Sequence, residues 1–152
     1  MFLFLSSLAI ANQYSHFATW ENPPDIYICG KNTQTIQEVK KSIEYWQNLG
    51  YNFGEIKKYQ TCQKQIPGAI IIKNEYFENK QGNTYIEKYY YGHEPNKEYI
   101  DFVIVRLNNE TKLYNNENKE SLIHEMGHAL GIDHVHNKSD IMYPYTRTNI
   151  TN

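Results

Sequence analysis

Residues 124–134 contain three histidines and one glutamate at spacings that suit a single metal ion. His124 and His128 are four positions apart, so on a helix they lie on one face and can bind the same ion. Glu125 lies ~100° around that helix from His124, where its carboxylate can reach a water beside the ion without taking a ligand position. Imidazole nitrogens with a neighbouring carboxylate are typical of a catalytic zinc site.

A third ligand follows shortly after this helix. Gly131 can adopt a positive φ, which would end the helix and turn the chain so that His134 reaches the same ion. Three protein ligands leave the fourth tetrahedral position open to water, as in catalytic rather than structural zinc sites. His136 is close enough to compete, but His134 has the better spacing. A bare His-Glu-x-x-His pattern also occurs in helices that bind nothing; the added glycine and histidine favour zinc.

The full pattern His-Glu-x-x-His-x-x-Gly-x-x-His, followed by a methionine turn, resembles the metzincin zinc peptidases. Residues 139–144 read Ser-Asp-Ile-Met-Tyr-Pro. Met142 matches the family methionine, which lies beneath the zinc as an apolar floor. Within that clan, Met-Tyr-Pro is similar to the matrixins. Astacins and serralysins resemble the chain less, because they carry a tyrosine where this chain has Pro144.

The resemblance implies a zinc-dependent endopeptidase that hydrolyses protein or peptide substrates, with Glu125 as general base and Gly131 and Met142 supporting the site. The alternative is a catalytically weak or inactive zinc-binding interaction domain with the same fold. The chain departs from the matrixin pattern at Val135, where serine is usual. Only ten residues follow Met142, which is shorter than the usual C-terminal helix, and the wall of the substrate pocket is expected at residues 144–147.

The elements that must position this site show periodic patterns. An apolar stripe at intervals of three and four predicts a helix from Ile36 to Leu49, with Thr35 and Glu38 as a capping box and a stop at Gly50. The zinc helix is predicted from Lys119 to Leu130, with Asn118 as its N-cap. Strands are predicted at Asp25–Cys29, Tyr51–Ile56, Ala69–Lys73, Thr84–Tyr91 and Ile100–Leu107.

These elements predict an α+β fold. It is similar to the metzincin (zincin) fold, a twisted mixed sheet of about five strands with an upstream helix and an active-site helix, followed by a small irregular subdomain that contains the methionine turn. Residues 12–152 would form one catalytic domain, with an upper subdomain over about 20–131 and a lower one over about 132–152. In metzincins the fourth strand is an exposed antiparallel edge that binds extended substrate, and by position this is Thr84–Tyr91.

The N-terminus and the cysteines predict a secreted, extracellular protein. Met1–Ala11 is an apolar run ending in Ala-Ile-Ala, as in a signal peptide cleaved after Ala11; the alternative is a buried N-terminal strand or helix. Cys29 and Cys62 are the two cysteines of the chain. In an exported protein they would form a disulfide, and the alternative is two buried free thiols.

Other partners receive less support. The net charge of −2 gives no electrostatic reason to expect nucleic acid or an anionic membrane, and the apolar N-terminal run is too short to span a bilayer. We expect a monomer. Asp133 and Asp140 are expected to hydrogen-bond within the turn, with a calcium ion as the unsupported alternative. His16 and His93 are expected at the surface.

Overall fold

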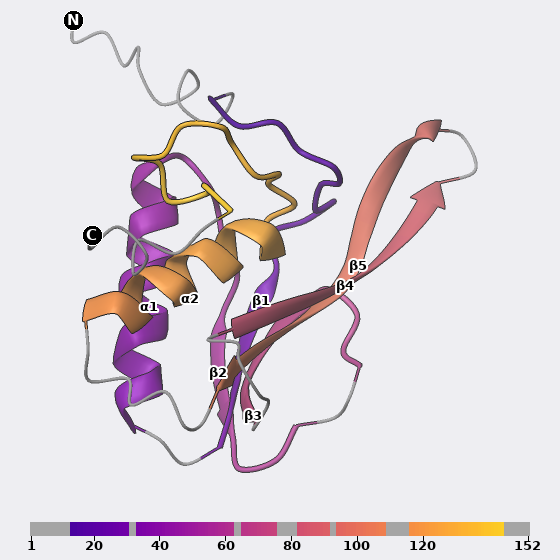
Figure 1. Cartoon of the computed structure of the whole chain (residues 1–152). Coiled ribbons are helices and arrows are strands. Elements are labelled where there is room, and N and C mark those ends of the chain that lie inside the picture. Colours follow the sequence, from indigo (N-terminus) through magenta and orange to yellow (C-terminus); the bar gives the residue numbers. More distant parts are fainter. Residues whose placement is uncertain are drawn as a thin grey trace, which may run out of the picture.

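The computed structural model describes residues 13–30, 33–62, 65–75, 82–91, 94–108 and 116–144. The predicted signal segment Met1–Ala11, residue His93 and the expected pocket wall at 145–147 lie outside the described residues. Within them, the structure has five strands and two helices, with four consecutive strands between the two helices (Figure 1). In order they are β1 (Asp25–Cys29), α1 (Thr33–Asn48), β2 (Ile56–Tyr59), β3 (Ala69–Glu75), β4 (Gly82–Tyr91), β5 (Glu94–Asn108) and α2 (Asn116–Ala129).

The strands form one mixed sheet in the order β2-β1-β3-β5-β4. The first four are mutually parallel, and β4 runs antiparallel to β5 at the edge. The connection between the parallel strands β1 and β2 contains α1. Strands β4 and β5 instead form a long hairpin that projects away from the rest of the sheet (Figure 1). The α+β class predicted from the sequence is therefore confirmed.

Both helices pack on one face of the sheet, where most of the core lies. Alternate residues of the parallel strands point to this face, as the pleat of a strand requires. Trp46 of α1 and Met126 of α2 are fully buried against them. The strand residues of this cluster are Ile26, Ile28, Ile70, Ile72, Ile100, Val103, Val105 and Leu107.

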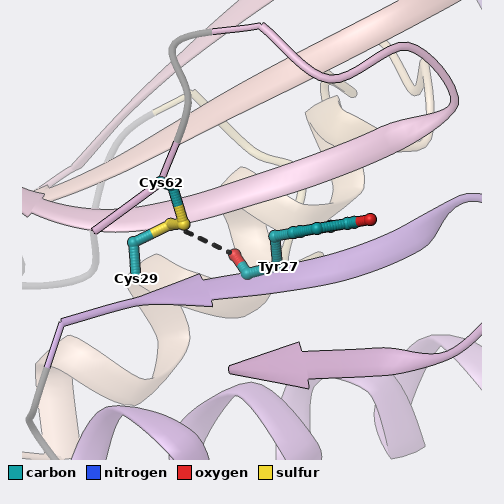
Figure 2. The surroundings of a disulfide bond; sticks show 3 residues. All are labelled: Tyr27, Cys29 and Cys62. Carbon is teal, nitrogen blue, oxygen red and sulfur yellow. Dashed lines mark hydrogen bonds between the residues drawn. A yellow bond between two sulfur atoms is a disulfide. The ribbon is translucent and has the colours of Figure 1, made fainter. Parts of the chain in front are cut away.

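The opposite face carries a smaller cluster of Ile71, Phe102 and Ile104. No helix of the described chain covers it; instead Cys62 and Ile66, from the segment after β2, pack there. A disulfide joins Cys29 at the end of β1 to Cys62, with the Cα atoms 5.6 Å apart (Figure 2). It fastens that segment to the sheet face that the helices leave uncovered.

One predicted strand was misplaced. Tyr51–Ile56 was expected to be extended, but β2 begins only at Ile56, where its pairing with Ile26 starts. The amide of Tyr51 instead bonds to the carbonyl of Trp46 at the end of α1, 3.1 Å away. Tyr51 and Phe53 pack against the core from this connection. The apolar residues at every second position therefore belong to a loop that covers the core, not to a strand.

The other elements lie close to their predicted positions. The first helix begins at Thr33, two residues before the predicted cap. The second begins at Asn116 and ends at Ala129. The last strand is longer than predicted, because it begins at Glu94, six residues before the predicted start at Ile100. Among the described residues, neither helix is long and apolar enough to cross a membrane.

Candidate metal site

The three predicted ligands come together at the end of α2 and in the turn that follows it. One ring nitrogen from each of His124, His128 and His134 lies within 4.8 Å of the others. The Nε2 atoms of His128 and His134 are 3.0 Å apart. Two nitrogens bound to one tetrahedral zinc would be separated by roughly 3.3 Å. The cluster is therefore already close to the spacing that a shared zinc ion needs.

Backbone carbonyls fix which nitrogen of two rings faces the cluster. His124 Nδ1 lies 2.6 Å from the carbonyl oxygen of Ile141, and His128 Nδ1 lies 2.9 Å from that of Ile132. A carbonyl oxygen only accepts, so each Nδ1 must carry the proton and donate. This leaves each Nε2 with a lone pair, and such a partner on the second nitrogen is usual for metal-binding histidines.

The surroundings of the cluster lower the pKa of two of the histidines. Burial lowers the pKa of His128 from 6.5 to about 4; the carbonyl of Ile132 opposes this, and the nearby rings of His124 and His134 add to it. Burial also lowers the pKa of His134, again with help from His124. Only neutral imidazole binds a metal ion, so neither ring has to lose a proton at neutral pH.

The turn that brings His134 back depends on Gly131 for two reasons. Its φ is +87°, which is unfavourable for residues with a side chain. In addition, a Cβ at this position would lie 2.0 Å from the carbonyl oxygen of Ala18. The segment before β1 passes against the turn here (Figure 1), with Phe17 N bonding to Gly131 O at 2.9 Å and Asp133 N to Ser15 O at 3.0 Å. The sequence predicted the positive φ but not this close approach.

Met142 lies fully buried against α2. A Cβ on Gly127 would meet the Met142 sulfur at 2.3 Å and Cζ2 of Trp46 at 2.7 Å. The missing side chain inside the His-Glu-x-x-His segment thus makes room for the methionine. Trp46 is itself held by a hydrogen bond from its Nε1 to the carbonyl of Ile123, 2.9 Å away.

Glu125 has a partner that the sequence did not indicate. The hydroxyl of Thr84, on edge strand β4, donates to Glu125 Oε2 and lies 3.2 Å from the Glu125 carbonyl oxygen. Thr84 and Glu125 are 41 positions apart. The sequence predicts that Thr84 lies in a strand, but no local signal could reveal which helix residue it would face.

Asp140 bonds within the turn, as expected: its Oδ1 accepts from the amide of Met142 at 2.8 Å. It also accepts from the phenol of Tyr14, a contact that the sequence did not reveal. Within the described residues, the three histidines are the one group of three or more potential ligands close enough to share an ion. His136 is exposed and lies outside this group, and His16 Nε2 is 3.0 Å from the Tyr51 hydroxyl.

The family model for Matrixin (Peptidase_M10) matches residues 108–152. This segment is matrixin-like. The match is partial, covering less than a third of the chain, but it includes α2, all three histidines and Met142. None of the curated proteins matches the sequence significantly. The matrixin-like segment and the histidine cluster together point to a zinc-binding, metallopeptidase-like site.

Proposed function

We propose that this chain is a zinc-dependent endopeptidase. His124, His128 and His134 hold the ion, and Glu125 is the general base. The observation that carries the proposal is the convergence of three imidazole nitrogens within 4.8 Å, beside a glutamate on the same helix. A site that only bound zinc would have no need of that carboxylate.

The residues divide the chemistry between them. Bound zinc supplies Lewis acidity, polarising the scissile carbonyl and lowering the pKa of a water molecule. The Glu125 carboxylate accepts a proton from the attacking water and later delivers it to the leaving amine. Ile132 and Ile141 orient the imidazoles of His128 and His124 through their carbonyls. Met142 closes the space behind the histidines with an apolar side chain.

Substrate would bind along β4. This strand pairs with β5 on one side and forms the edge of the sheet. An edge strand offers its unpaired backbone groups to an extended peptide, which can add as a further strand. Thr84 in this strand contacts Glu125, so a peptide added there would run beside the proposed base.

The same proposal covers the setting of the enzyme. Residues 12–152 act as one catalytic domain, with the matrixin-like segment completing a lower subdomain after residue 131. The protein is exported as a monomer after removal of Met1–Ala11. The disulfide between Cys29 and Cys62 supports an oxidising, extracellular location, because such bonds are rare in reducing compartments.

The test combines metal content with proteolysis. Purified protein is assayed for bound zinc and for cleavage of casein, with and without the chelator 1,10-phenanthroline. Wild type should bind one zinc ion and cleave casein only without chelator. Glu125→Ala should keep the zinc and lose about 10²–10⁴-fold in turnover. Glu44→Ala, an exposed position on α1, is the matched control and should behave as wild type.

Two results would contradict the proposal. Substantial cleavage by Glu125→Ala would remove the glutamate from its assigned role. Stoichiometric zinc without chelator-sensitive cleavage by wild type would instead favour a non-catalytic zinc-binding domain. A peptide library would then define the cleavage preference of an active enzyme.

A further inference from the structure

Thr84 connects the edge of the sheet to the proposed base. It lies on β4 opposite Val105 of β5, and its neighbour at i+2, Ile86, packs into the cluster under the helices. Residues two apart in a strand share a face, so Thr84 points toward α2. Its hydroxyl reaches both the carboxylate and the backbone carbonyl of Glu125.

The hydroxyl has one proton and two acceptors within reach. The Glu125 carbonyl oxygen is 3.2 Å away. The carboxylate oxygen Oε2 is closer, and an ionised carboxylate accepts a stronger hydrogen bond than a neutral carbonyl does. The proton therefore goes to Oε2. Glutamate has three side-chain torsions, and a fixed carboxylate oxygen restricts them.

We propose that Thr84 is a positioning residue, which holds the Glu125 carboxylate at a fixed place relative to the strand where substrate would add. This inference rests on the proposed function. One residue then belongs to both parts of the site: its backbone lies in the edge strand, and its side chain orients the base. Thr84 therefore also sets the position of a peptide paired with β4 relative to the Glu125 carboxylate. Small misplacements of a catalytic group cost up to about a hundredfold in rate.

The decisive variants are Thr84→Val and Thr84→Ser. Valine has nearly the same shape and suits a strand equally well, but it cannot donate. Serine keeps the donor. We expect Thr84→Val to lower kcat by about tenfold or more, with KM and zinc content unchanged. Thr84→Ser should recover most of the loss.

Thr19→Val is the matched control. The Thr19 hydroxyl is buried without a hydrogen-bond partner in the described structure, so the same substitution there should leave kcat and KM as in wild type. A readout that needs neither zinc nor substrate is the carboxyl ¹³C resonance of Glu125 in the zinc-free protein, assigned by its loss in Glu125→Gln. It should shift in Thr84→Val and return toward wild type in Thr84→Ser.

The outcomes separate the two proposals. If wild type shows no chelator-sensitive cleavage, the proposed function fails, and this inference fails with it. If wild type cleaves and Thr84→Val has the same kcat, or the Glu125 resonance does not move, the inference alone is overturned. Equal losses in Thr84→Val and Thr84→Ser would also overturn it, because they would show that the hydroxyl is not what matters.

Discussion

The phenol of Tyr14 donates to the carboxylate of Asp140, lying 3.2 Å from each carboxylate oxygen across 126 positions of sequence. Asp140 in turn accepts from the amide of Met142, and the carbonyl of Ile141 between them accepts from His124. Through these contacts, the segment before β1 supports the turn that orients one proposed ligand.

Removing the Tyr14 hydroxyl should therefore weaken both the fold and the site. Tyr14→Phe keeps the ring, which packs edge-on against Trp46, but leaves the Asp140 carboxylate without this donor. We expect about 1.5–3 kcal/mol less free energy of unfolding, as for hydrogen bonds to charged groups, and weaker zinc binding. Urea denaturation and a competitive zinc titration measure the two effects.

The control for this change is Tyr59→Phe. Tyr59 is 47% exposed and stacks on Tyr27, so losing its hydroxyl should cost little. If Tyr14→Phe behaves like Tyr59→Phe in both measurements, the contact with Asp140 does not support the site.

Gly131→Ala should be more harmful than its backbone angle alone predicts. Alanine at positive φ costs about 1–2 kcal/mol, and here the new Cβ also meets the Ala18 carbonyl at 2.0 Å. Gly68→Ala provides the comparison, since Gly68 also has positive φ but nothing within 4 Å of an added Cβ. The difference between the two melting temperatures isolates the clash. Equal decreases in melting temperature would show that the segment before β1 moves away from the new methyl group without loss of stability.

The local parts of this structure could be predicted, and the long-range contacts could not. Helical geometry alone places His124 and His128 on one face. The apolar residues at intervals of three and four predict α1 in the same local way. The contacts of Thr84 with Glu125 and of Tyr14 with Asp140 join residues far apart in the sequence. They depend on how the sheet edge docks on α2 and how the first segment docks on the turn that follows α2, which no spacing within either segment encodes.

Two local patterns were also ambiguous in themselves. Alternating Tyr51 and Phe53 fits a strand, yet both residues pack on the core from a loop. Gly127 looks like a weak point of helix α2, because glycine lowers helix propensity. Its function is evident only once Met142 is placed against it. Such a residue serves tertiary packing, which overrides local preference.

This packing predicts a coupling between Gly127 and Met142. Gly127→Ala should destabilise by about 1–3 kcal/mol, because its Cβ would overlap the Met142 sulfur. Met142→Ala should cost about 2–5 kcal/mol through the cavity it leaves. The double variant should be more stable than the sum of the two losses predicts, since the new methyl group occupies part of that cavity. Urea unfolding of all four proteins gives the coupling energy, and strict additivity would contradict the contact.

The last prediction concerns the pH dependence of the zinc-free protein. Burial lowers the pKa of His128 to about 4, from 6.5. Between these pH values the unfolded chain binds a proton that the folded protein does not. The stability that His128 contributes is therefore present above ~6.5 and is lost as the pH falls toward ~4. His134, whose pKa is also lowered by burial, adds a contribution of the same sign.

Urea denaturation in chelator, at pH values from ~7 to ~4, should show this loss in wild type. His128→Gln should reduce the slope, whereas His136→Gln, at an exposed position outside the cluster, should leave it unchanged. Saturating zinc should make the slope steeper over the same window, because protons then also displace the ion from its ligands. Parallel curves for wild type and His128→Gln would show that His128 is not buried as a neutral ring in the folded, zinc-free protein.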